Sequence, residues 1–149
     1  MIFIIVLLVL FFDQLTKFFA AKTIGLNQSI PVINNIFHLT LVHNKGAAFG
    51  ILKNQTLLFT AISLVTIFVI SHHLRKKRGK GLDIFTVSLS LILSGAIGNF
   101  IDRASLGYVV DFLDFRIWPV FNLADSAITI GAVLLGFLIL KSNKEKKQN

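Results

Sequence analysis

The feature that most constrains this chain is a set of four apolar stretches that are long enough, or nearly so, to cross a bilayer. They run over about residues 2–21, 56–71, 82–101 and 121–140. Because a helix rises ~1.5 Å per residue, roughly 20 apolar residues span a ~30 Å hydrocarbon core. The second stretch is short, and we expect it to extend into Ile51–Gln55 or His72–Leu74. The sequence therefore predicts an all-α membrane protein with four transmembrane helices, in one domain covering residues 1–149.

Composition agrees with a membrane protein. Hydrophobic residues make up 54% of the chain and charged residues only 15%, whereas soluble domains carry about 25% charged residues. A soluble core built from 149 residues would be too small to bury so many apolar side chains. The chain has no cysteine, which excludes disulfides, thiolate metal sites and a cysteine nucleophile.

The basic residues predict the orientation in the membrane. The net charge of +8 is concentrated in the loop at 71–81 and in the tail at 141–149. Cytoplasmic segments of membrane proteins are enriched in Lys and Arg, so both termini are expected inside and the loops at 22–55 and 102–120 outside. No recognition motif accompanies the basic charge, and nucleic acid is not expected as a partner. The first stretch lacks a basic start and contains Asp13 and Lys17, which favours a retained helix over a cleaved signal peptide.

The first outer loop contains a predicted strand. Residues 38–43 alternate in polarity and are rich in residues that favour strands. We therefore expect a small amphipathic sheet on the outer membrane surface.

Acidic residues are few and unevenly placed. Five of the seven fall toward the predicted outer side: Asp13, Asp102, Asp111, Asp114 and Asp125. This concentration is unusual because the bilayer penalises charge. Of the other two, Glu145 lies in the tail, and Asp83 is placed to cap the third helix.

Two helical segments place polar side chains on shared faces. Asp13 and Lys17 are four residues apart and can pair near the interface or toward the bundle interior. Asn99 and Asp102 also share a face, in a stretch whose small residues permit close helix contact. Arg103 can form a fork-like pair with a carboxylate.

Asp111 and Asp125 are candidates for acid–base chemistry. Asp111 follows two valines just past the third span, and Asp125 falls in the first turn of the fourth helix, which Asn122 can cap. Two facing aspartates can share one proton. The ionised member then takes a proton from water while the neutral member polarises a carbonyl. This pair has enough chemistry to hydrolyse an amide.

Two other kinds of site are open from these residues. Ser126 could work as a nucleophile if folding brought His38 or His43 to it, and the outer carboxylates could hold a divalent cation. An HExxH zinc motif is absent from the sequence.

Five ordered segments resemble the lipoprotein signal peptidase family, also called signal peptidase II. They lie at residues 13–17, 44–50, 95–103, 109–112 and 121–126 and occur in the family's order, and the resemblance extends over nearly the whole chain. The resemblance implies four transmembrane helices with a small extracytoplasmic β-cradle, in the bacterial cytoplasmic membrane with both termini cytoplasmic. It also implies an aspartic endopeptidase that removes signal peptides from diacylglyceryl-modified prolipoproteins by cutting just before the lipidated cysteine. The enzyme would act as a monomer without cofactor or metal.

The resemblance also implies roles for individual residues. Asp111 and Asp125 match the family's catalytic aspartates. The positions that match supporting residues, or residues that contact substrate or inhibitors such as globomycin, are Asp13, Lys17, Asn44, Gly46, Asn99, Asp102, Arg103 and Asn122. This chain departs from the family at Lys45, where a small polar residue is common, and in a shorter segment from Asp111 to Asp125, which bears on how an outer lid closes.

A non-enzymatic alternative is a small membrane transporter or ion-binding protein whose outer carboxylates hold a cation. It would account for polar groups facing a bundle interior. The sequence lacks the paired interrupted helices that many transporters use. A purely structural membrane scaffold would leave the outer cluster of polar groups without a purpose.

Overall fold

The computed structural model describes residues 2–46, 55–77 and 83–148, with backbone only for 143–148. Four helices and three strands follow in the order α1 (Ile2–Thr23), β1 (Ser29–Ile33), β2 (Phe37–Asn44), α2 (Thr56–Lys76), α3 (Ile84–Leu106), β3 (Val109–Asp114) and α4 (Leu123–Gln148). Motif residues 47–50, the basic residues Arg78 and Lys80, and the start of the predicted third span at Leu82 lie outside the described residues.

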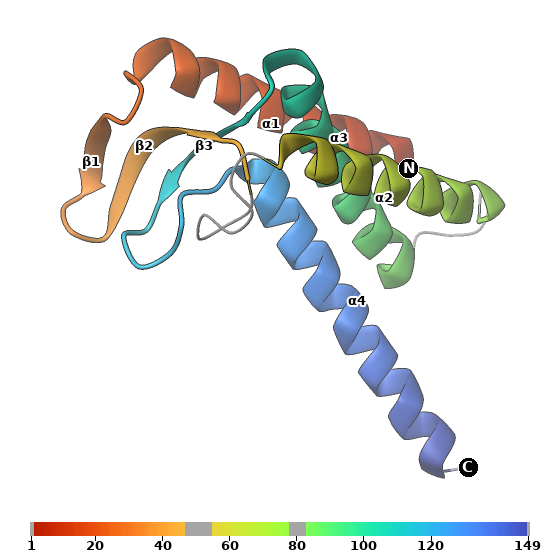
Figure 1. The fold of residues 1–149 in the computed structure, drawn as a ribbon. Coiled ribbons are helices and arrows are strands. Elements are labelled where there is room, and N and C mark those ends of the chain that lie inside the picture. The colour runs from red at the N-terminus through yellow and green to blue at the C-terminus, as the bar shows by residue number, and fades with distance from the viewer. Residues whose placement is uncertain (1, 47–54, 78–82, 149) are drawn as a thin grey trace.

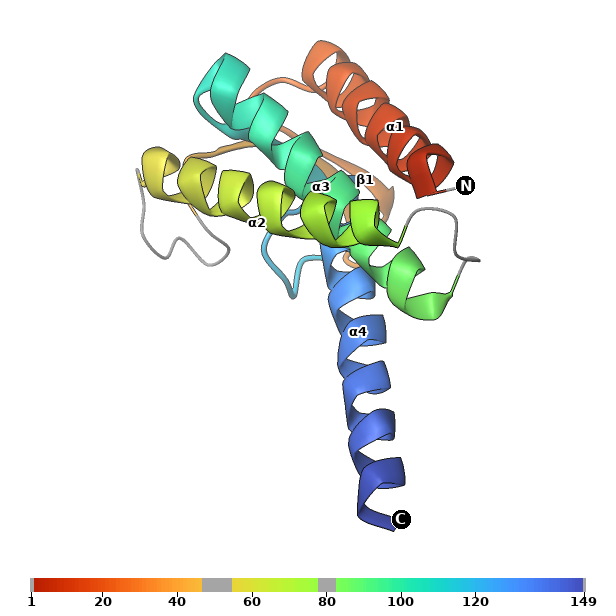
Figure 2. The ribbon, with the colours of Figure 1, turned by 90° about the vertical axis from the view of Figure 1, so that its right-hand side faces the viewer.

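Helix α3 is the centre of the bundle. It packs against α1, α2 and α4, and 56% of its most apolar window is buried, against 17% in each of the other helices. Figure 2 shows α1 beside α3 and α2 crossing it. Helix α4 continues beyond its partners, and its C-terminal end projects from the molecule (Figure 1).

Polarity is arranged as in a protein that lies in lipid. Fully buried side chains include Asp13, Asp111, Asn122 and three serines of α3, while large apolar side chains of α1, α2 and α4 are exposed. Apolar side chains lose nothing by facing lipid, whereas polar groups must find partners inside the protein. The four helices are long and apolar enough to span a membrane, so the prediction of a multi-pass membrane protein is confirmed.

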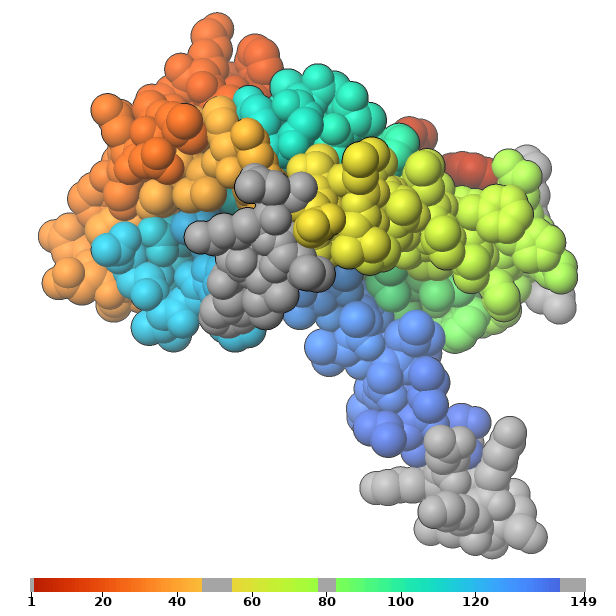
Figure 3. Space-filling view, viewed as in Figure 1, coloured from red at the N-terminus to blue at the C-terminus, as the bar shows by residue number. Residues whose placement is uncertain are grey.

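The strands form one antiparallel sheet in the order β1–β2–β3. Strand β2 contains the predicted strand at 38–43, which is therefore confirmed. The sheet lies at one end of the helices, opposite the end at which α2 finishes (Figures 1 and 3). One face packs on α1 through a cluster of Ala20, Ile24, Leu41, Val110 and Phe112. This packing fixes β3 beside the C-terminal parts of α1 and α3.

The helix limits differ from the predicted spans in instructive ways. Helix α2 extends through Lys76 and so takes in His72–Leu74, one of the two expected extensions. The prediction of a loop from Asp102 onward is wrong, because α3 continues to Leu106 and ends where Gly107 takes a left-handed conformation, with φ of 80°. Asp102 lies inside the helix, where its buried carboxylate is paired with Lys17. The tail at 141–149 was expected to be separate from the fourth helix, yet α4 runs through Gln148.

Candidate active site

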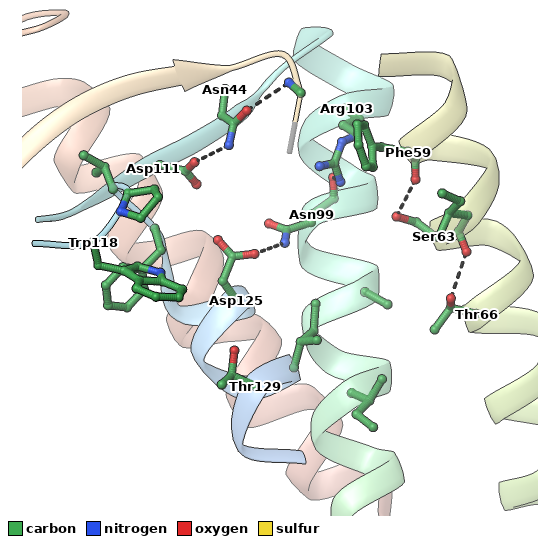
Figure 4. Close-up of a pocket in the computed structure, with 18 residues that line it drawn as sticks. Asn44, Phe59, Ser63, Thr66, Asn99, Arg103, Asp111, Trp118, Asp125 and Thr129 are labelled. Carbon is green, nitrogen blue, oxygen red and sulfur yellow. Dashed lines mark hydrogen bonds between the residues drawn. The ribbon is translucent and has the colours of Figure 1, made fainter. Parts of the chain in front are cut away.

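Asp111 and Asp125 reach one cavity from two different elements. Asp111 lies in β3 and is 1% exposed, while Asp125 lies in the first turn of α4 and is half-buried. Figure 4 shows both carboxyl groups pointing into the same space between β3, α3 and α4. Asn122 bridges them: its Nδ2 donates to Asp111 Oδ1 at 2.7 Å, and its backbone N–H donates to Asp125 Oδ2 at 3.3 Å.

The start of α4 positions Asp125. Asn122 Oδ1 accepts a hydrogen bond from the backbone N–H of Asp125 at 2.9 Å, while Asp125 Oδ2 accepts one from the backbone N–H of Asn122. This reciprocal arrangement is a capping box in which Asn122 is the N-cap and Asp125 is the third residue of the helix. The predicted cap at Asn122 is therefore confirmed, and the same contacts orient the carboxylate that faces the cavity.

Each of the four carboxylate oxygens of the pair accepts a hydrogen bond from an asparagine. Asn44 Nδ2 donates to Asp111 Oδ2 at 2.8 Å, and Asn99 Nδ2 donates to Asp125 Oδ1 at 2.7 Å. Asn122 supplies the other two bonds. The backbone N–H of Gly46 donates to Asn44 Oδ1 at 2.9 Å and so orients the amide of Asn44. Three asparagines from β2, α3 and the cap of α4 thus hold the two carboxyl groups.

The environment of Asp111 favours its protonated form. Its pKa is raised from 3.8 to about 7, first by burial and then by the negative charge of Asp125. The hydrogen bonds from Asn44 and Asn122 and the charge of Lys17 act in the opposite direction. A carboxyl group with a pKa near neutrality can hold or release a proton during a reaction.

Behind the pair lies a second layer of buried charge. Lys17 Nζ is 2.9 Å from Asp13 Oδ2 and 3.0 Å from Asp102 Oδ2, and it donates to Asn99 Oδ1 at 3.1 Å. The predicted pairing of Asp13 with Lys17 is confirmed, and both side chains face the bundle interior. Because Lys17 also contacts Asn99, this layer is directly connected to the groups around Asp125.

Arg103 has a different environment from the one predicted. Among the described residues it forms no ion pair within 4 Å, and the fork-like pair with a carboxylate is not formed. Its guanidinium lies 5.5 Å from the centre of the Phe59 ring, and its Nη1 is 3.5 Å from the carbonyl oxygen of Asn99. Asp102, the nearest acid in sequence, is engaged by Lys17 instead. Arg103 therefore presents its charge to the cavity (Figure 4).

Two cavities meet at Asp125. The first, here called the polar cavity, has a volume of about 430 Å³, and its polar lining residues are Asn44, Ser63, Thr66, Asn99, Arg103, Asp111, Asp125 and Thr129. The second, here called the apolar cavity, has a volume of about 510 Å³ and is lined by Phe115, Ile117, Trp118, Phe121, Asp125, Ser126, Thr129 and Ile130. The exposure of Ile117 and Ile130 opens the apolar cavity toward the outside of the bundle.

The described residues do not assemble the competing sites. Ser126 Oγ donates to the carbonyl oxygen of Asn122, His38 contacts Ser29, and His43 stacks on Tyr108 with the ring centres 3.8 Å apart. A serine triad is therefore not formed. Within the described ranges, no three acidic or histidine side chains gather as a set of metal ligands, so the site lends no support to the ion-binding alternative.

Sequence reasoning missed two groups of site residues. Gln14 donates to both Asp13 and Asp102. The sequence did contain a signal for this role, because Gln14 is a polar amide next to Asp13 in a largely apolar helix. Trp118 and Thr129 line both cavities, and no sequence pattern marks them, because their place depends on how the β3–α4 connection folds.

Known proteins match this chain over nearly its full length. Residues 5–141 match the family described as signal peptidase (SPase) II. The lipoprotein signal peptidase of Halothermothrix orenii is 49% identical over 144 residues, which cover 97% of this chain and 98% of that protein. The lipoprotein signal peptidase of Caldanaerobacter subterraneus subsp. tengcongensis is 50% identical over 141 residues, covering 94% and 96% of the two chains.

Solved structures agree with these matches. One bacterial membrane enzyme shares the fold with a TM-score of 0.90 at 37% identity, covering 99% of this chain and 92% of its own. A second has a TM-score of 0.80 at 36% identity, covering 94% and 92%. With four apolar helices, a small sheet and two aspartates at one cavity, the chain belongs to the signal peptidase II family, the aspartic peptidases called lipoprotein signal peptidases.

Proposed function

We propose that this chain removes signal peptides from diacylglyceryl-modified prolipoproteins, with Asp111 and Asp125 as its catalytic pair. The observation that carries the proposal is the convergence of the two carboxyl groups on the polar cavity, with an asparagine donor on each oxygen. The names of the matching relatives support the reaction class.

The pair carries one shared proton when it binds substrate, and we assign it to Asp111. Asp125 accepts a proton from a water molecule as the water oxygen attacks the scissile carbonyl carbon. The Asp111 carboxyl donates its proton to the carbonyl oxygen, which gives a tetrahedral diol. Collapse of the diol breaks the C–N bond, as Asp125 gives its proton to the leaving nitrogen and Asp111 recovers one from a hydroxyl group. The pair returns to its starting state, and each proton is accounted for.

The surrounding polar groups bind and orient the substrate in this proposal. Asn44 and Asn99 keep the carboxyl groups aimed at the cavity, and the positive charge of Arg103 attracts carbonyl oxygens of the bound peptide. Buried amide donors are effective because they are already oriented before substrate arrives. The polar cavity therefore takes the peptide backbone around the scissile bond.

The apolar cavity suits the lipid of the substrate. It adjoins Asp125, and its walls are mainly the aromatic and aliphatic side chains of Phe115, Trp118, Phe121 and Ile130. Its exposed rim lets an acyl chain pass from the cavity directly into lipid. The apolar surface of the chain is then not exposed to water, which would be unfavourable. A lipid on the residue after the scissile bond would thus lie next to the carboxyl groups, as the proposed cut requires.

We place the site at the extracytoplasmic face of the bacterial cytoplasmic membrane, with both termini inside. The connections that carry the sheet and Asp111 lie at one end of the helices, and Arg75, Lys76 and Lys77 lie at the other end of α2. Positive charge is retained on the cytoplasmic side. This arrangement supports an outward site, where water can reach the carboxyl groups.

Conversion of a purified diacylglyceryl prolipoprotein tests the proposal. Mass spectrometry should show cleavage just before the lipidated cysteine, and the same precursor without its lipid should remain uncut. Asp111→Asn and Asp125→Asn should each abolish conversion, whereas Asp114→Asn, which changes an aspartate elsewhere in the sheet, should leave most of it. Near-full turnover by either of the first two variants would overturn the assignment.

A further inference from the structure

Two buried carboxylates of the second layer hold the backbone immediately before each residue of the catalytic pair. Asp13 Oδ1 accepts a hydrogen bond from the backbone N–H of Ala124 at 2.8 Å, one residue before Asp125. Asp102 Oδ2 accepts one from the backbone N–H of Val110 at 3.1 Å, one residue before Asp111. We call Asp13 and Asp102 the anchor carboxylates. The position of each catalytic aspartate therefore depends on one anchor carboxylate.

Helix α1 ties the two anchor carboxylates together. Gln14 Nε2 lies 3.2 Å from Asp13 Oδ2 and 3.1 Å from Asp102 Oδ1, and it also lies 3.3 Å from the carbonyl oxygen of Gly98. Lys17 Nζ spans the same two anchors with its charge. One amide and one ammonium thus fix the distance between two carboxylates that would otherwise repel each other.

We propose that Gln14 is a positioning residue that sets the separation of Asp111 and Asp125 through the anchor carboxylates. This inference rests on the proposed function. The hydrogen bonds of the Gln14 side chain go to the anchors and to Gly98, and none goes to the catalytic pair or its asparagines. Its influence on the reaction therefore passes through the backbone of Val110 and Ala124.

Lys17 would be a poorer probe of this idea. It also donates to Asn99, which itself holds Asp125, and its loss would leave two buried carboxylates without a counter-charge. Gln14 is uncharged and half-buried. Replacing it by methionine keeps the length of the side chain and the Lys17 ion pairs, and removes only the amide that joins the anchors.

Gln14→Met is expected to lower kcat on the order of 100-fold, the effect of a shift of about 1 Å in a reacting group, with KM nearly unchanged. The alkaline limb of the pH–rate profile should also move to lower pH. The negative charge of Asp125 helps to keep the proton on Asp111, and this help weakens as the two carboxyl groups separate. A general loss of folding would not shift that limb.

Thr16→Val is the matched control. Thr16 lies on the same helix with similar burial. Among the described residues, its hydroxyl donates only to the carbonyl oxygens of Phe12 and Asp13 within α1. Thermal melting of both variants should show comparable stability. Thr16→Val should keep near-full kcat and an unmoved pH limb.

Gln14→Glu gives a second test that does not depend on the methionine variant folding. The introduced carboxylate faces both anchors and cannot donate until it is protonated. The ratio of the turnover of Gln14→Glu to that of the unmodified chain should therefore rise as the pH falls from about 8 to about 5. The proposal fails if Gln14→Met matches Thr16→Val in kcat and pH limb, or if this ratio stays flat. In either case the Asp111→Asn variant tells the two claims apart. If Asp111→Asn turns over substrate, the proposed function is wrong too. If Asp111→Asn is inactive, only the positioning role of Gln14 is rejected.

Discussion

Lys17→Met should destabilise the protein strongly. The Lys17 ammonium has acceptors at 2.9, 3.0 and 3.1 Å, and its side chain is only 4% exposed. Its removal leaves Asp13 and Asp102 buried without a counter-charge. Breaking a buried ion pair by removing one partner costs about 3–5 kcal/mol, and here one ammonium serves two carboxylates. We therefore expect the free energy of unfolding to fall by about 3–5 kcal/mol.

Lys77→Met is the matched control. Lys77 Nζ is also 2.9 Å from a carboxylate oxygen, that of Asp83, but these side chains are 35% and 53% exposed. Water already solvates both groups, so this ion pair should contribute little to stability. The two variants remove the same charge and an ion pair of the same length. They differ in burial and in the second carboxylate that Lys17 serves.

The assay is equilibrium unfolding in mixed micelles with increasing SDS, followed by helical circular dichroism. The reasoning is refuted if Lys17→Met and Lys77→Met unfold at the same SDS fraction.

Further predictions concern the pH profile and the packing of α3. Turnover should decline above a pH near 7, because the pKa of Asp111 is raised to about 7 and the pair then loses its shared proton. Asn44→Ala removes a hydrogen bond that lowers this pKa, so the alkaline limb should move to higher pH; an unmoved limb would show that Asp111 does not govern it. Gly98→Ala should cost about 1–3 kcal/mol of unfolding free energy, because the added methyl group meets the buried carboxylate of Asp13. Gly136→Ala, where an added methyl group meets nothing within 4 Å, should be neutral or stabilising in the same unfolding assay.

The fold was predictable where a single helix or strand carries the signal. Apolar length alone specifies four spans, and the four-residue spacing of Asp13 and Lys17 is enough to place them on one helix face. Local capping is also predictable: Asp83 accepts a hydrogen bond from the backbone N–H of Thr86 at 2.7 Å, as its position before α3 indicates. These features depend on contacts between residues close in the sequence.

The site was less predictable because its geometry depends on long-range contacts. Arg103 was expected to pair with a nearby acid, but Asp102 forms its ion pair with Lys17, which lies 85 positions earlier in α1. Asp13 accepts a hydrogen bond from the backbone N–H of Ala124, which lies 111 positions later in the sequence. Asp102 accepts one from the backbone N–H of Val110, which lies 8 positions later and in a different element. A pattern read along one helix cannot show which backbone N–H will be brought to a buried carboxylate.

The most direct test of the central claim is a double-mutant cycle on Asp111 and Asp125, the proposed catalytic aspartates. Single-turnover rates on diacylglyceryl prolipoprotein would be measured for Asp111→Asn, Asp125→Asn and the double variant. Because residues that act as one unit lose their function together, each single variant should fall to the residual rate, and the double variant should fall no further. The account is contradicted if either single variant retains substantial turnover. It is also contradicted if each single variant loses only part of the rate and the fold-loss of the double variant equals the product of the two single fold-losses.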